Sequence, residues 1–109
     1  MYRQNPLKSR LAAGQPALGC WVFSTDSSVA ENLAQAGFDA LIIDHEHCGS
    51  DLPGLVHALQ AISASGCAGL VRVPSNDAVY IKRVLDIGVE GIVVPNVQSA
   101  AEARAAVAA

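Results

Sequence analysis

The sequence has few cysteines and no long hydrophobic run. Its three cysteines, Cys20, Cys48 and Cys67, include no Cys-x-x-Cys pair. An odd number of widely spaced cysteines argues against a disulfide framework and is typical of reduced thiols in the cytoplasm. No apolar stretch reaches the roughly 18 to 20 residues that cross a bilayer, and residues 1–6 lack the apolar segment of a secretory signal. We therefore expect a cytoplasmic protein with no membrane partner.

The chain also lacks an excess of positive charge. Seven Lys and Arg stand against ten Asp and Glu, which gives a formal net charge of −3 at pH 7. No basic patch is therefore expected, and a nucleic-acid partner is disfavoured. A hydrophobic content of 51% beside 16% charged residues is typical of one small globular domain, and 109 residues are too few for two.

Apolar runs and amphipathic stripes alternate along the chain. A short helix is predicted over residues 6–13, and four strands are predicted to start near Leu18, Ala40, Gly69 and Gly91. Each strand is followed by a segment predicted to be helical, most clearly where apolar residues recur three and four apart. Such alternation predicts βαβ units and a parallel sheet. Because a full (β/α)8 barrel needs about 250 residues, we expect an α/β fold, the N-terminal half of a TIM barrel, with residues 1–109 forming a partial domain.

Two Ser-x-x-Glu sequences predict helix starts. Ser28 precedes Glu31 and Ser99 precedes Glu102 at the spacing of a capping box, in which the hydroxyl and the carboxylate each accept from a free backbone amide. Helices are therefore expected to begin directly after Ser28 and Ser99.

The predicted strand over residues 40–43 ends abruptly in Asp44, His45, Glu46 and His47. A buried parallel strand is expected to be continuously apolar, and α/β folds bind their ligands beyond the carboxyl ends of the strands. Four titratable groups at this point are costly to desolvate unless they bind a ligand or each other. This segment is therefore the candidate site.

The two histidines allow two interpretations. Residues i and i+2 of an extended segment share a face, so His45 and His47 could both ligate one metal ion, as in a metal-dependent hydrolase. Asp44 and Glu46, on the opposite alternation, could then orient the imidazoles. In the second interpretation, one or both histidines are hydrogen-bonded residues at the end of a strand.

Arg72 interrupts the apolar strand predicted over residues 69–73. A guanidinium cannot lose its charge on burial, so Arg72 must pair with an anion, either a ligand oxyanion or Asp44 or Glu46 from the neighbouring strand. Trp21 is expected in the core or on the floor of the barrel. Asp86, near the end of the helix predicted over residues 79–87, is by itself typical of a solvated surface acid.

Five segments that lie in order and without large gaps resemble the HpcH/HpaI aldolase family: LGCW (18–21), AGFD (36–39), IDHEH (43–47), VRVPSND (71–77) and IKRVLDIG (81–88). The resemblance implies a class II pyruvate aldolase, a carbon–carbon lyase that cleaves 4-hydroxy-2-oxo acids to pyruvate and an aldehyde through a metal-stabilised enolate. It also implies a small 2-oxo acid as substrate, Mg²⁺, Mn²⁺ or Co²⁺ as cofactor, and a homo-oligomer.

The resemblance also implies roles for individual residues. The family's catalytic histidine falls on His47, which leaves His45 at a variable position, and Arg72 matches the arginine that contacts the ketone oxygen of the pyruvate unit. Asp44 matches a site aspartate, and Glu46 matches the glutamate that precedes the histidine.

Two further implications concern groups outside this cluster. Asp86 matches an aspartate that reaches the catalytic histidine from a neighbouring subunit. The family's metal ligands, a glutamate and an aspartate on later strands, have no match in residues 1–109. We therefore expect no metal ligand within this chain, a site that holds the acid/base and arginine half alone, and weak or no activity for residues 1–109 in isolation. The alternatives are a TIM-barrel hydrolase that uses His45 and His47 as ligands, and a non-catalytic half-barrel fragment.

Overall fold

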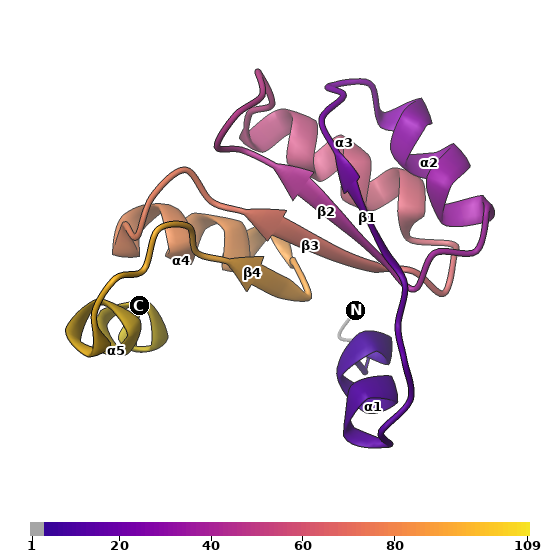
Figure 1. Ribbon diagram of the computed structural model, residues 1–109. Helices are drawn as coiled ribbons and strands as arrows, with labels where there is room; N and C mark the ends of the chain where they lie inside the picture. The colour runs from indigo at the N-terminus through magenta and orange to yellow at the C-terminus, as the bar shows by residue number, and fades with distance from the viewer. Residues whose placement is uncertain (1–3) are drawn as a thin grey trace.

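The computed structural model describes residues 4–109. Within that range, helices and strands alternate as the sequence predicts (Figure 1). The elements are α1 (Pro6–Ala12), β1 (Gly19–Val22), α2 (Ser27–Gln35), β2 (Ala40–Asp44), α3 (Leu52–Ile62), β3 (Ala68–Arg72), α4 (Ala78–Ile87), β4 (Gly91–Val93) and α5 (Ala100–Ala108).

The four strands form one parallel sheet in the order β1-β2-β3-β4. Figure 1 shows α2, α3 and α4 along one face of this sheet, with α1 near the end at which β1 begins and α5 beyond β4. The register between β2 and β3 pairs Asp44 with Arg72, so the last residue of each strand lies beside the other at the carboxyl edge. The prediction of a parallel α/β sheet is confirmed.

The core lies between the sheet and the helices that cover it. Leu41 and Ile43 of β2 and Val71 of β3 are buried together with Leu55 of α3 and Val84 of α4. Full burial of such side chains stabilises a fold by about 1.5 to 3 kcal/mol each. Because these strand residues alternate along the chain, their neighbours point to the opposite face of the sheet.

Trp21 lies on that opposite face, so of its two predicted places the core between sheet and helices is wrong. It is paired with Ile42 in the sheet and is 39% exposed, whereas Val22 beside it is 2% exposed and joins the core. The alternation along β1 therefore directs Trp21 away from the helices. Its register partner in β2, and that residue's partner in β3, each lie two residues before Asp44 and Arg72, so Trp21 shares a face of the sheet with both.

Side-chain caps fix where the helices start at the carboxyl edge of the sheet. The carboxylates of Asp26, Asp51 and Asp77 accept from backbone amides in the first turns of α2, α3 and α4. Ser99 accepts from the amide of Glu102 at the start of α5, as predicted. The predicted cap at Ser28 is wrong, because Asp26 accepts from the amide of Ser28 and α2 begins earlier.

Among the described residues, no helix is both long enough and apolar enough to cross a membrane.

We expect Gly69→Ala to destabilise the fold by about 1 to 3 kcal/mol, the usual cost of overpacking a core. A Cβ at Gly69 would overlap Cδ2 of Leu59 and lie 3.1 Å from Cδ1 of Ile62, both on α3. Urea denaturation measures the change. Gly66→Ala is the matched control, because a Cβ there meets nothing within 4 Å, and equal losses in the two variants would contradict this account of β3 against α3.

Candidate active site

An ion pair joins the carboxyl ends of β2 and β3. The Nε of Arg72 donates to Oδ1 of Asp44 at 2.6 Å and lies 3.1 Å from Oε2 of Glu46. The Asp44 side chain is fully buried, and that of Arg72 is 18% exposed. Of the anions that the sequence allowed for Arg72, the structure therefore provides both carboxylates of the neighbouring strand end.

The loop after β2 folds around the carboxylate of Asp44. The amide of Glu46 donates to Oδ1 at 3.2 Å, and the amide of His47 donates to Oδ2 at 3.0 Å. The Cys48 thiol donates to the backbone carbonyl of Asp44 at 2.9 Å. The buried carboxylate of Asp44 thus binds Arg72 and also fixes the path of the backbone through residue 47. These three donors satisfy the negative charge of Asp44, which would otherwise be costly to bury.

These contacts set the charge states of the pair. The hydrogen bond from Arg72, helped by the two loop amides, lowers the pKa of Asp44 from 3.8 to about 2 against the opposing effect of burial. The same bond to Asp44 raises the pKa of Arg72. Asp44 is therefore a carboxylate, and Arg72 a cation, at every physiological pH.

Trp21 packs against the guanidinium. The Cζ of Arg72 lies 4.5 Å from the centroid of the Trp21 ring, within the range of a cation–π contact. Phe23 stacks on Trp21 with the ring centroids 6.2 Å apart. Sequence reasoning missed this role of Trp21. The available signal was its position in the alternation of β1, which places it on the face of the sheet that carries Arg72.

The structure separates the two histidines, so the shared-face interpretation of the pair is wrong. The side chain of His47 is 66% exposed, and its Nε2 lies 3.5 Å from Oε2 of Glu46. His45 is 6% exposed, and its Nδ1 lies 2.7 Å from the hydroxyl of Tyr80. Strand β2 ends at Asp44, so the alternation that would align the two imidazoles does not continue. This removes the geometric basis of the hydrolase alternative.

His45 occupies a site that favours its neutral form. Burial lowers the pKa of its imidazole, and the nearby carboxylates of Asp44 and Asp51 oppose that effect without reversing it. Burial also raises the pKa of Tyr80. Among residues 4–109, the Nε2 of His45 has no hydrogen-bond partner.

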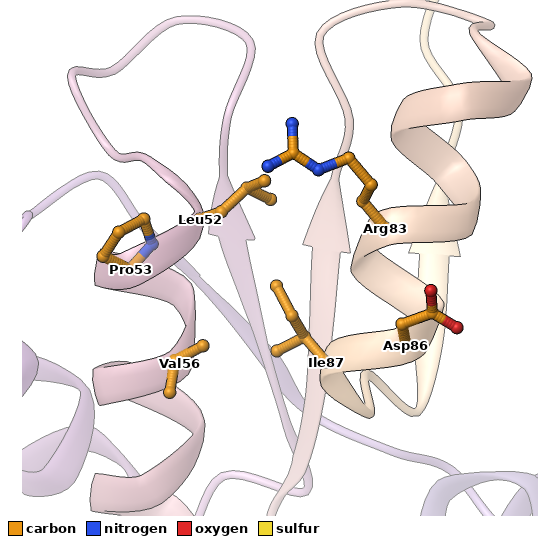
Figure 2. Close-up of a pocket in the computed structure, with 6 residues that line it drawn as sticks. All are labelled: Leu52, Pro53, Val56, Arg83, Asp86 and Ile87. Atoms are coloured by element: carbon orange, nitrogen blue, oxygen red, sulfur yellow. The ribbon is translucent and has the colours of Figure 1, made fainter.

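Asp86 lies apart from the cluster around Arg72. Figure 2 shows it on α4, beside a groove between α3 and α4. The volume of this groove is about 420 Å³. The other residues that line the groove are Leu52, Pro53, Val56, Arg83 and Ile87. Within this chain, therefore, Asp86 lines an outer groove between two helices, and the structure does not bring it into the polar cluster.

A second hollow, of about 630 Å³, opens at the carboxyl edge of the sheet beside Glu46. It is lined by Pro74, Ser75 and Asn76 after β3, Pro95 and Asn96 after β4, and Ala101, Glu102 and Ala105 of α5. Its volume lies in the range of about 300 to 1,000 Å³ that small ligands occupy. The polar cluster therefore borders a space that a small acid could enter.

The described residues do not fit a metal centre. Residues 4–109 hold no group of three or more His, Cys, Asp or Glu side chains that could hold a metal ion. The oxygens of Asp44 already accept from Arg72 and two amides. The arrangement instead offers a fixed cation and an accessible imidazole beside a carboxylate.

Acid titration provides a test of the buried ion pair. A carboxylate with a lowered pKa in the folded state stabilises the fold above its unfolded pKa, and this contribution is lost as the pH falls from about 4 to about 2. Discounted for screening by solvent, the contribution of Asp44 is about 1 to 2 kcal/mol. We expect Asp44→Asn to flatten the fall in unfolding free energy over this pH range, as measured by urea denaturation. Asp86→Asn is the control, and an equal slope in both variants would contradict the assignment.

Comparison with known proteins places this geometry in a family. The HpcH/HpaI aldolase/citrate lyase family matches residues 17–109. A 2-dehydro-3,6-dideoxy-6-sulfogluconate aldolase of Pseudomonas putida is 48% identical over 84% of this chain and 36% of its own length. A 4-hydroxy-2-oxo-heptane-1,7-dioate aldolase of Klebsiella pneumoniae is 46% identical over 96% of this chain and 40% of its own.

A solved structure shows the same arrangement of elements. The HpcH/HpaI aldolase/citrate lyase family protein of Burkholderia cenocepacia J2315 superimposes with a TM-score of 0.90 at 36% identity, over 95% of this chain and 42% of that one. The chain spans about two fifths of the length of these relatives, so its four βα units correspond to part of a TIM barrel. By sequence match and by fold, the chain belongs to the HpcH/HpaI aldolase/citrate lyase family.

Proposed function

We propose that this chain supplies the proton-transfer and oxyanion-binding half of an aldolase site that cleaves 4-hydroxy-2-oxo acids to pyruvate and an aldehyde. Residues 1–109 would then form part of a larger barrel domain. The observation that carries the proposal is the position of Arg72, held by Asp44 and Glu46 at the carboxyl edge of the sheet and next to the exposed imidazole of His47. Aldolases among the relatives support the reaction class.

Arg72 would bind the ketone oxygen of the 2-oxo acid. Its two ion pairs use Nε, so the Nη groups are the donors that remain for a ligand oxygen. Asp44 and the ring of Trp21 hold the guanidinium before any substrate arrives. A donor fixed in advance stabilises the oxyanion that develops as the carbon–carbon bond breaks, because no reorganisation is needed at that moment.

His47 would remove the proton from the 4-hydroxyl group, which becomes the aldehyde oxygen. Its ring is accessible, and its Nε2 lies 3.5 Å from Oε2 of Glu46, so a positioned side chain is available for the proton transfer. We further propose that Asp86 of a neighbouring copy reaches His47 in a homo-oligomer, since Asp86 of the same chain lines the groove between α3 and α4.

The cofactor belongs to the part of the site that these residues do not form. We propose that a divalent cation, Mg²⁺, Mn²⁺ or Co²⁺, would be held by carboxylates outside residues 4–109, where it would supply a Lewis acid. The relatives named above act on different acids, so the proposal specifies the 2-oxo acid end of the substrate and leaves its aldehyde half open. The cytoplasmic location stays a prediction from the sequence.

A chimaera tests the proposal, with residues 1–109 replacing the corresponding segment of the Klebsiella aldolase. We expect it to release pyruvate from a 4-hydroxy-2-oxo acid with added Mn²⁺, measured by coupling to lactate dehydrogenase. His47→Ala should lower kcat by about 10²- to 10⁴-fold, the usual contribution of a general base. Arg72→Ala should lower kcat/KM by about 10²- to 10³-fold, as for loss of an oxyanion donor.

His57→Ala is the matched control, because His57 is an exposed histidine on α3. It should leave kcat and KM unchanged. An active chimaera in which His47→Ala behaves like His57→Ala would overturn the role assigned to His47. A folded chimaera that releases no pyruvate would overturn the aldolase function of this chain.

A further inference from the structure

The buried His45–Tyr80 pair has no part in the reaction proposed above. His45 lies between Asp44 and Glu46 of the polar cluster and two residues before His47, yet its side chain is 6% exposed and contacts Tyr80. A histidine buried with Nε2 unpartnered among residues 4–109 is costly to keep. A buried polar atom without a partner therefore calls for an explanation in terms of another role of the residue.

The contacts of His45 show what it does mechanically. Its backbone amide donates to the carbonyl of Arg72 at 2.9 Å, which extends the pairing of β2 and β3 by one residue. Its Nδ1 and the Tyr80 hydroxyl share a hydrogen bond of 2.7 Å, and the two rings meet edge to face with centroids 6.2 Å apart. His45 is therefore tied to β3 by its backbone and to α4 by its ring.

Tyr80 is itself a fixed anchor. It lies in the first turn of α4, and its amide donates to the capping carboxylate of Asp77 at 2.9 Å. The next turn of α4 is buried through Ile81 and Val84. Tyr80 thus lies at the capped and packed start of a helix. Its hydroxyl therefore allows little movement of the His45 ring to which it is hydrogen-bonded.

The direction of the next two residues depends on this anchor. The chain after Asp44 is irregular, and in the loop the amides of Glu46 and His47 are held by the Asp44 carboxylate alone among the hydrogen bonds of the described residues. Rotation of the backbone at residue 45 would displace both amides. The carboxylate of Glu46, which lies beside Arg72, and the exposed imidazole of His47 would move with them. A ring clamped between β3 and α4 prevents that rotation.

We propose that His45 and Tyr80 form a positioning pair that fixes residues 44–48, and through them the imidazole of His47 relative to Arg72. The proposal rests on the function proposed above for His47, and it assigns a role to a histidine that the family resemblance treats as variable. His45 acts through its neighbours and touches neither substrate nor cofactor. His45 and Tyr80 are therefore positioning residues, whereas Arg72 and His47 are proposed to contact the substrate.

Amide hydrogen exchange in the 109-residue chain tests the positioning pair without any activity measurement. Tyr80→Phe removes the hydroxyl and keeps the ring. We expect it to speed exchange at the amides of Glu46 and His47 by about three- to tenfold, the effect of one lost hydrogen bond. The amide of Val73, which donates to the carbonyl of Val93, should keep its rate. Unchanged rates at residues 46 and 47 would overturn the proposal, as would an equal increase at Val73, which indicates general destabilisation.

Substitutions of His45 give a second series that does not depend on Tyr80. An asparagine places a polar atom near the position of Nδ1, whereas an alanine does not. We expect His45→Ala to speed exchange at residues 46 and 47 and His45→Asn to restore part of the protection. His57→Ala on the exposed face of α3 is the control and should change neither rate. Equal exchange in the alanine and asparagine variants would contradict a role for the Nδ1 hydrogen bond.

Kinetics of the chimaera then separate this proposal from the proposed function. Tyr80→Phe should lower kcat about three- to tenfold and leave KM for the 2-oxo acid within twofold, because Arg72 keeps its own contacts. If His47→Ala abolishes activity while Tyr80→Phe leaves kcat unchanged, the positioning role is wrong and the aldolase function stands. If His47→Ala has no effect in an active chimaera, the role assigned to His47 is wrong, and the exchange rates alone decide whether the pair fixes the loop.

Discussion

The bond between Arg72 and Asp44 is the interaction on which the rest of the site depends. A guanidinium at the end of an inner strand must be neutralised where it lies, and the parallel register of β2 and β3 places a buried carboxylate directly beside it. The same carboxylate accepts from the two amides that follow it. The pair thus links the end of the sheet to the loop that carries His47, and a change in either partner alters both the charge of the site and its shape.

Much of this could be predicted from the sequence, because it follows from strand ends and periodicity. An apolar run that stops at Asp44 and a strand interrupted by Arg72 are visible without coordinates, and parallel pairing brings adjacent strand ends together. The helices after each strand follow from apolar residues three and four apart. The family resemblance then separated His47 from His45, a distinction that the alternation rule did not make.

Other features depend on contacts between elements that are distant in sequence. The alternation rule failed at His45 because β2 ends at Asp44, one residue before it. The hydrogen-bond partner of the His45 ring is Tyr80, 35 positions away on α4. Trp21 was predicted only as a residue of the core or of the barrel floor, whereas in the sheet it faces away from the helices and its ring lies against the guanidinium of Arg72. Helix α2 begins earlier than predicted because two neighbouring side chains, Asp26 and Ser28, can both cap a helix. In the structure the carboxylate of Asp26 accepts from the amide of Ser28 and forms the cap.

The helix caps at the carboxyl edge have an electrostatic consequence for ligands. In many α/β proteins, the free amides and positive dipole of a helix start bind the anionic part of a substrate. Here Asp26, Asp51 and Asp77 already accept from the first-turn amides of α2, α3 and α4, so three negative charges stand where an anion would otherwise bind. The edge of the sheet around Arg72 is thereby made attractive to cations. For an acidic ligand, the guanidinium of Arg72 is the main positive charge at the ends of the central strands.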